Sequence, residues 1–230
     1  EGVTEPYFDF ATASGQVATT TSLVSSINPS VSGQTVTFTA SIAPSTATGT
    51  VLFQVGATPL AGCVAVTVTA GQAQCSISTL EIGTNSVSAV YSGDNGNLAS
   101  TSSTLNQLVN PPTLDIDASN SQTKYDAATD GVLVVRYLFG VTGNSLATGA
   151  LGGTATRTDP AQIKSYLDAI RPVLDIDGNG RAEALTDGLL IVRHLLGLTS
   201  DALIAGAVDQ QSGTRKLATD IHNYLQALMP

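Results

Sequence analysis

The first half of this 230-residue chain has no lysine and no arginine. Residues 1–113 carry only five charged side chains, all acidic, namely Glu1, Glu5, Asp9, Glu81 and Asp94. The nine basic residues and the other thirteen acids lie in residues 114–230, and the net charge is −9. A chain this acidic, with one half free of cations, is a poor ligand for nucleic acid or an anionic membrane surface. We therefore expect neither as a partner.

Long apolar runs and an N-terminal leader are also missing. No run approaches the roughly 20 residues of a membrane-spanning helix, so we expect no span. The first six residues lack the basic and apolar regions of a signal peptide. We expect that a signal has been removed or that the sequence is a fragment of a larger chain.

Tryptophan is absent, and there are only two cysteines. Phe38, Phe53 and Tyr91 fall in strand patterns that suit a core, which disfavours carbohydrate binding through stacked rings. Cys63 and Cys75 are twelve residues apart in one β-rich stretch, which favours a disulfide over the alternative of two buried free thiols. A disulfide indicates an oxidising compartment, so we expect an extracellular or cell-surface protein.

Residues 17–110 read as one all-β domain. Apolar residues alternate with Thr and Ser in short runs, and Gly, Asn and Pro mark the turns between the runs. The runs are 34–42, 51–55, 64–68, 73–77, 87–91 and 103–109. Short strands at this spacing predict an antiparallel β-sandwich.

The same segment resembles bacterial Ig-like repeats. The resemblance is carried by residues 19–23, 28–30, 33–38, 48–51 and 89–94. It implies a spacer or an adhesive module without catalysis. Ahead of it, residues 1–16 contain the aromatic stretch Glu5–Phe10, which is either part of a linker lying on the sandwich or a segment that adds to a sheet edge.

Two prolines in residues 111–113 mark a boundary, and a tandem repeat follows, 114–173 and 174–230. Leu114-Asp-Ile-Asp117 matches Leu174-Asp-Ile-Asp177, and Thr129-Asp-Gly131 matches Thr186-Asp-Gly188. Pro172 matches Pro230, so we expect the chain to end where a repeat ends. Each repeat reads as loop, helix, connection and helix. The expected helices lie near 133–138, 160–171, 189–196 and 217–228.

The second loop has oxygen ligands at the spacing of an EF-hand. Ca²⁺ takes six to eight oxygen ligands, and a short loop with carboxylates at alternate positions can turn them inward. Asp187 arrives at position thirteen instead of twelve, so one residue must bulge. The candidate ligands are Asp175, Asp177, Asn179, the backbone carbonyl of Arg181, Glu183 as a direct or water-mediated ligand, and Asp187.

The first loop is three residues longer and lacks glycine. Ser119 or Asn120 could supply the fifth-position ligand, and Asp126 is the counterpart of Glu183. The candidate ligands are Asp115, Asp117, Ser119, Asn120, Lys124, Asp126 and Asp130. The alternative for both loops is an Asp-rich turn that caps a helix. Mg²⁺ suits these loops less, because it demands tight octahedral geometry and keeps its waters.

Residues 114–230 resemble dockerin-type domains, mainly over Asp175–Leu196. The resemblance implies two calcium loops, each followed by a helix, and a cohesin β-sandwich as partner. Many dockerins carry a Ser/Thr pair before the closing Asp, where this chain has Leu185-Thr186 and Ala128-Thr129. That departure disfavours cohesin recognition and leaves calcium binding as the expectation.

No reactive set for an enzyme can be assembled. The two histidines, His194 and His222, fall in helical patterns and are expected at the surface or at a helix interface. No phosphate loop, zinc spacing or nucleophile motif is present. We predict a non-catalytic, calcium-stabilised extracellular structural or adhesion protein. The alternative is a docking or assembly module that binds a partner β-sandwich or self-associates head-to-tail into filaments.

Overall fold

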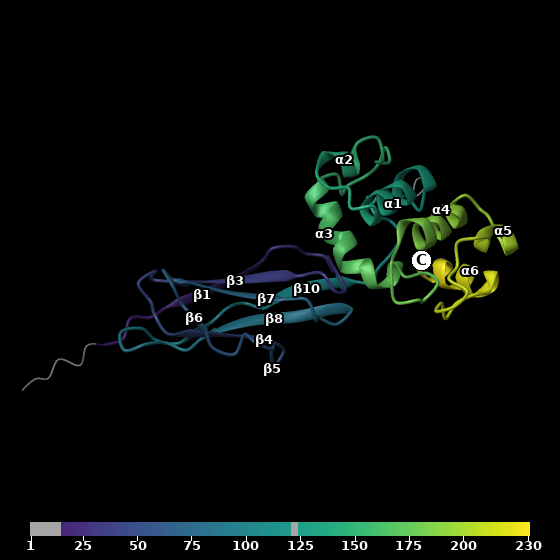
Figure 1. Ribbon diagram of the computed structural model, residues 1–230. Coiled ribbons are helices and arrows are strands. Elements are labelled where there is room, and N and C mark those ends of the chain that lie inside the picture. Colours follow the sequence, from purple (N-terminus) through teal and green to yellow (C-terminus); the bar gives the residue numbers. More distant parts are fainter. Residues whose placement is uncertain (1–14, 121–123) are drawn as a thin grey trace, which may run out of the picture. The chain divides into compact units, whose positions relative to one another are not determined.

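The computed structural model describes residues 15–120 and 124–230. The chain divides into two compact units, one strand-rich unit holding most of residues 15–107 and one helical unit holding residues 108–230 (Figure 1). The aromatic stretch Glu5–Phe10 lies outside the described residues.

The strand-rich unit is built from two sheets. The smaller sheet has the order β1-β3-β7. The larger has the order β2-β10-β8-β4-β5, with β6 also pairing with β4 and β9 with β8. The pairs β1–β3, β3–β7, β4–β5, β4–β6, β4–β8 and β8–β9 are antiparallel, and β2 and β10 are parallel. The strands are β1 (Thr20–Ser25), β2 (Ser30–Val31), β3 (Val36–Ala43), β4 (Thr50–Val55), β5 (Thr58–Pro59), β6 (Val66–Thr67), β7 (Gln72–Ile77), β8 (Gly83–Tyr91), β9 (Ser100–Thr101) and β10 (Leu105–Asn110).

Alternation along the strands places the core between the two sheets. In β3, every second residue from Val36 to Ile42 is buried, and the residues between them are only partly covered. Strands β4 and β8 add Phe53 and Tyr91, which like Phe38 are 0% exposed. A side-chain period of two with one face covered is what a sandwich requires. The predicted Ig-like sandwich is therefore confirmed.

The predicted disulfide is present and braces the sandwich. Cys63 and Cys75 are bonded, with their Cα atoms 5.7 Å apart, and both are buried. Cys75 lies in β7 of the smaller sheet. The carbonyl of Cys63 accepts a hydrogen bond from the Phe53 amide in β4 of the larger sheet, at 3.0 Å. The crosslink therefore joins one sheet to a segment bonded to the other.

The carboxylate of Asp94 joins two turns of the sandwich through hydrogen bonds. Asp94, in the turn after β8, accepts hydrogen bonds from the amide and hydroxyl of Thr48, both at 2.7 Å. It also accepts from the Gly96 amide, the Asn97 side chain and the Tyr91 hydroxyl. These donors, those of Thr48 first, hold the pKa of Asp94 well below its usual range.

The helical unit repeats one series of elements twice. A π-helical turn leads directly into an α-helix, then a short helix, then a longer one. The first series is η1 (Ala127–Gly131), α1 (Val132–Leu138), α2 (Asn144–Ala147) and α3 (Pro160–Ile170). The 3₁₀ turn η2 (Arg171–Leu174) connects it to η3 (Ala184–Gly188), α4 (Leu189–Leu195), α5 (Ser200–Ile204) and α6 (Ala218–Ala227). The four expected helices are present, and α2 and α5 lie in what the sequence showed only as connections.

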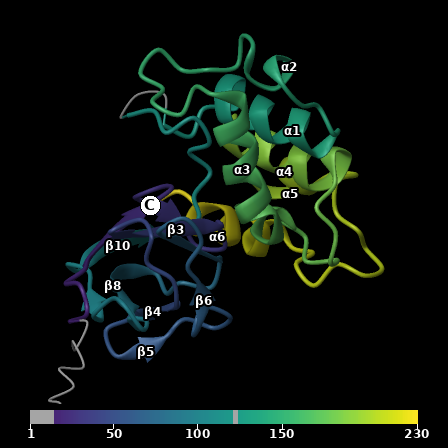
Figure 2. The same ribbon diagram turned by 90° about the vertical axis from the view of Figure 1, so that its left-hand side faces the viewer.

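The two repeats pack through a reciprocal close approach at their glycines. A Cβ atom on Gly131 would lie 3.1 Å from Val192 Cγ2, and one on Gly188 would lie 3.1 Å from Val135 Cγ2. Each Thr-Asp-Gly motif therefore ends on a glycine because the helix of the other repeat passes against it. Helices α1 and α4 consequently lie side by side, as both views show (Figure 2).

The two ends of the helical unit also meet. The Leu114 amide donates to the Leu228 carbonyl at 2.9 Å. Lys124 Nζ and the Tyr125 hydroxyl both donate to the Pro230 carbonyl, each at 3.0 Å. The start of the first loop is thus held against the end of the last helix.

Candidate metal centres

Each repeat gathers three aspartates into one cluster. Asp115, Asp117 and Asp130 form the first triad, and Asp175, Asp177 and Asp187 form the second. Within each triad one carboxylate oxygen per residue lies within 4.8 Å of the others. The second and third members of each triad are 0% exposed. Three carboxylates this close and this deeply buried are suited to a cation.

The closing aspartate ties the loop to the helix that follows it. Asp187 Oδ1 accepts from the amides of Ile176 (2.6 Å) and Asp177 (3.3 Å), while Oδ2 accepts from the Glu183 amide (2.9 Å) and the Thr186 hydroxyl (3.0 Å). Asp130 makes the equivalent bonds in the first repeat. Both loop ends are therefore held by one side chain, whose carboxylate also belongs to the triad.

Each closing aspartate lies in a π-helical turn, which in the second loop accommodates the extra residue that the sequence predicted to bulge. The Gly188 amide donates to the Glu183 carbonyl at 3.0 Å, and the Gly131 amide donates to the Asp126 carbonyl at 3.1 Å, both across five residues. A π-turn holds one residue more than an α-turn and often occurs at functional sites. The predicted bulge is thus a widened first helical turn, which turns Asp130 and Asp187 back toward their loops.

The middle aspartate joins each loop to the second half of its repeat. Asp117 Oδ2 accepts from the Gly152 amide at 2.6 Å, and Asp177 Oδ2 accepts from the Asp209 amide at 2.8 Å. The other oxygen of each bonds within the loop, to the amide of Ser119 or Asn179. The partners lie more than 30 residues away, so sequence reasoning did not identify Gly152 or Asp209.

An arginine from each repeat holds the backbone of the loop. Arg157 donates to the carbonyls of Asp115 and Ile116, and Arg215 donates to those of Asp175 and Ile176. Each guanidinium stacks on a tyrosine, at 3.8 Å from the Tyr166 ring centroid and 4.0 Å from the Tyr224 centroid. These arginines were not among the candidates predicted from the sequence, and the structure gives them a positioning role.

The charge of the triads is not neutralised by basic side chains. Among the residues that the structure describes, no lysine or arginine forms an ion pair with a triad carboxylate. Burial raises the pKa of Asp130 to about 6, and it also raises the pKa values of Asp115 and Asp177. Neighbouring aspartates add to each rise. A divalent cation would favour the ionised form of all three groups.

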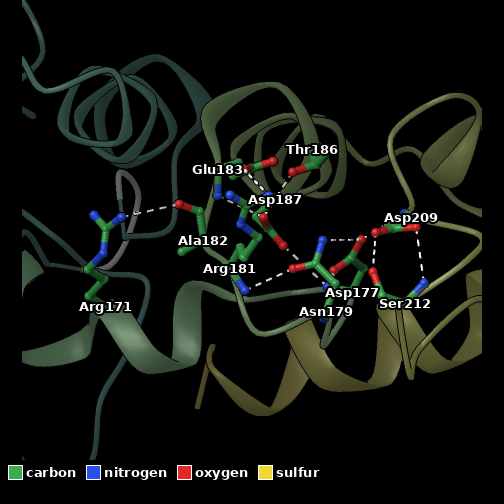
Figure 3. A network of polar contacts seen from close by, with 10 residues as sticks. All are labelled: Arg171, Asp177, Asn179, Arg181, Ala182, Glu183, Thr186, Asp187, Asp209 and Ser212. Carbon is green, nitrogen blue, oxygen red and sulfur yellow. Dashed lines mark hydrogen bonds and ion pairs between the residues drawn. The ribbon is translucent and has the colours of Figure 1, made fainter.

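The remaining candidates of the second loop, Asn179, Arg181 and Glu183, lie near Asp177 and Asp187 (Figure 3). The amide of Asn179 donates to both Asp175 and Asp177, at 3.0 and 3.1 Å, and its side-chain oxygen accepts from the Arg181 amide. The side chains of Arg181 and Glu183 form an ion pair at 3.6 Å, with Arg181 largely exposed.

The remaining candidates of the first loop differ among themselves. The Ser119 hydroxyl is buried without a hydrogen-bond partner among the described residues, and its amide bonds Asp115 and Asp117. Asp126 caps η1 by accepting from the Ala128 amide at 2.6 Å, and Lys124 bonds Pro230. Asn120 is exposed, and the three residues after it, 121–123, lie outside the described part.

One position in each loop has a left-handed backbone conformation, but its residue type differs between the two loops. Gly178 has φ +72°, and its counterpart Ala118 has φ +53°. A Cβ atom at Gly178 would lie 2.1 Å from Thr214 Oγ1. Thr214 Oγ1 donates to the Gly178 carbonyl at 3.2 Å, and its counterpart Thr156 Oγ1 donates to the Ala118 carbonyl at 2.9 Å. The first loop therefore has a backbone conformation that favours glycine, although the residue there is alanine.

Comparison with known proteins assigns the sandwich. Residues 23–110 match the family model of the bacterial Ig-like domain (group 3). This segment is Ig-like in both sequence and fold. The Ig-like domain is followed by the helical unit with its two aspartate triads. None of the described helices is long and apolar enough to cross a membrane.

The other comparisons add little. No curated protein matches the chain. A solved structure of a polysaccharide lyase is similar over 90% of this chain, at 12% identity and a TM-score of 0.31. The chain spans 34% of that protein's length. A similarity of this size carries no inference about function.

Proposed function

We propose that this chain is a non-catalytic extracellular structural or adhesive protein in which Ca²⁺ stabilises the helical unit. The Ig-like sandwich serves as a spacer. The observation that carries the proposal is the pair of buried aspartate triads, which occur at equivalent places in the two repeats. The Cys63–Cys75 disulfide is consistent with an extracellular location.

The chemistry of the loops favours Ca²⁺ among common cations. The groups brought together are carboxylates, and the first loop adds the buried Ser119 hydroxyl, which has no hydrogen-bond partner among the described residues. Oxygen ligands alone suit Ca²⁺ or Mg²⁺ and are poor ligands for softer metals. A loop that can contribute carboxylates, an amide and a backbone carbonyl suits the larger, more flexible coordination of Ca²⁺.

The metal would act mainly on stability. Each closing aspartate bonds both the start of its loop and the turn into α1 or α4, so a cation on that aspartate fixes loop and helix together. A ligand present at about 100 times its Kd adds about 2.7 kcal/mol per site to the free energy of unfolding. Two sites would add about twice that amount to the helical unit alone.

Calorimetry of the whole chain tests this proposal. We expect two Ca²⁺ per chain in titration calorimetry. Scanning calorimetry in EDTA should lower the melting transition of the helical unit and leave that of the sandwich in place. Identical melting curves in EDTA and in millimolar Ca²⁺ would contradict the proposal.

Matched variants identify the ligands. Asp130→Asn and Asp187→Asn should each remove one Ca²⁺. Asp201→Asn is the control, because Asp201 is an exposed acid in α5 and its substitution changes the charge equally. A loss of Ca²⁺ in Asp201→Asn as large as in the triad variants would indicate general electrostatic attraction instead.

A second candidate is a docking or assembly function, in keeping with the dockerin resemblance. Phe139 and Leu196 lie at equivalent positions just after α1 and α4 and are 60% and 64% exposed. The partner would be another β-sandwich, either of a different protein or of a second copy of this chain. Light scattering with and without Ca²⁺, followed by electron microscopy, tests self-assembly. A monomer at every Ca²⁺ concentration would remove the head-to-tail filament.

A further inference from the structure

The two histidines of the chain lie against each other in the second repeat. His194 is in α4 and His222 is in α6, and their ring centroids are 5.0 Å apart with an interplanar angle of 62°. His194 is only 8% exposed, so it belongs to the helix interface and not to the open surface. The pair is formed by residues 28 positions apart and has no spacing motif.

Both rings have a nitrogen with no partner. The Nδ1 atoms of His194 and His222 are buried and make no hydrogen bond within the described part of the chain. A buried polar atom left unsatisfied is uncommon and unfavourable. Burial, and secondarily the neighbouring His222, lowers the pKa of His194 and favours its neutral form. A neutral imidazole is also the form that binds a metal.

In the first repeat, the side chains at the two equivalent positions have a hydrogen-bond partner within the protein. The counterparts of His194 and His222 are Tyr137 and Lys164, and both bind Asp168. The distances are 2.9 Å from the Tyr137 hydroxyl and 2.7 Å from Lys164 Nζ. The counterpart of Asp168 in the second repeat is Gln226. The second repeat has therefore replaced an acid-linked pair with two imidazoles and no acid.

We propose that His194 and His222 form a binding site for a divalent transition metal of the Zn²⁺ class, separate from the aspartate triads. A metal about 2.0–2.1 Å from one nitrogen of each ring, at a tetrahedral angle, places the ring centroids about 5 Å apart. The observed centroid distance is 5.0 Å. The rings thus already have the separation that a shared metal requires.

The surroundings leave room for the other ligands. An open pocket of about 350 Å³ borders His222 and is lined by Thr199, Ser200, Ala218, Thr219 and Asn223. Two waters, or a water and a hydroxyl or amide oxygen from this lining, would complete four-coordination. Imidazole nitrogen favours Zn²⁺, Ni²⁺ or Cu²⁺ over Ca²⁺, so the two kinds of site would select different ions.

Zn²⁺ titration of the Ca²⁺-saturated full chain tests the proposal. We expect one Zn²⁺ per chain with a micromolar Kd at neutral pH. His194→Tyr and His222→Lys introduce the residues that the first repeat carries, and each should weaken Zn²⁺ binding at least tenfold. Asp94→Asn, which makes the same change of charge in the sandwich, should leave it unchanged. Ca²⁺ stoichiometry in each histidine variant reports separately that the helical unit is folded.

The outcomes separate this site from the proposed calcium sites. Zn²⁺ binding that is absent in the wild type, or unchanged in both histidine variants, would overturn the inference. So would Zn²⁺ binding that is lost in Asp187→Asn and retained in the histidine variants, because the ion would then occupy a triad. In nitrogen-15 NMR, Zn²⁺ should shift the ring-nitrogen resonances of both histidines together, and a shift in neither would overturn direct ligation.

Discussion

The sandwich and the helical unit are held together by different means. The sandwich buries apolar side chains between two sheets and adds one covalent crosslink. The helical unit also has an apolar core, but it buries four aspartates at 0% exposure in the same structure. Buried charges destabilise a fold unless they are paired or bind a metal. The sandwich therefore contains its stabilising bonds, whereas in the helical unit the proposed Ca²⁺ would offset the charge of the buried aspartates.

The largest effect within the sandwich should come from breaking its crosslink. Replacing both Cys63 and Cys75 by Ala should lower the free energy of unfolding of the sandwich by about 3 kcal/mol, the value typical of a short closed loop. Scanning calorimetry in Ca²⁺ should show the sandwich transition shifted down and the helical transition unmoved. A reducing agent acting on the wild type should have the same selective effect. A shift of both transitions would contradict the expectation that the disulfide stabilises the sandwich alone.

The next effect concerns the reciprocal contact between the repeats. Gly188→Val and Gly131→Val should each destabilise the helical unit by about 2 kcal/mol, because the added carbons overpack against Val135 or Val192. Both variants should do so to a similar extent, since the two contacts are equivalent. Gly153→Val is the control, because nothing lies within 4 Å of its Cβ position. Chemical denaturation in Ca²⁺ measures all three.

Two smaller effects on stability concern the equivalent left-handed positions of the two loops, 118 and 178. Ala118→Gly should stabilise the helical unit by about 1 kcal/mol, because glycine adopts a positive φ without the steric cost that alanine has. Gly178→Ala should destabilise it by about the same amount or more, since its Cβ atom would also collide with Thr214. Equal signs for the two variants would contradict the equivalence of these positions. Ca²⁺-loaded protein and chemical denaturation suit this comparison.

The smallest effect is a pH dependence of the sandwich that comes from Asp94. Asp94 has a lower pKa folded than unfolded, so its carboxylate stabilises the fold above the unfolded pKa of about 3.9. That stabilisation is lost as the pH falls below this value toward the folded pKa. The melting temperature of the sandwich should drop by a few degrees between pH 4 and pH 2. Asp94→Asn should already show the lower melting temperature at pH 6 and should flatten this part of the profile.

The sequence predicted most where the signal was local. Alternation identified the strands of the sandwich, and the spacing of Asp175, Asp177 and Asp187 placed three carboxylates at one point. Contacts with distant or backbone partners were not predictable. Arg157 and Arg215 bind backbone carbonyl groups about 40 residues away in the sequence. Because every residue has a carbonyl group, no sequence pattern marks these partners. His194 is buried because α6 covers it, which a helical pattern in α4 alone cannot show.

The hydrogen bond from the Leu114 amide to the Leu228 carbonyl links the two repeats a second time. Within the chain, Ile170 at the end of α3 is joined to Leu174 through η2. Leu228 and Leu114 are the counterparts of those two residues, and a hydrogen bond links them. The duplicated unit is thus a ring with one covalent and one non-covalent junction. A circular permutant that begins at residue 174 and joins residue 230 to residue 114 through a short linker should fold, because neither repeat is structurally the first.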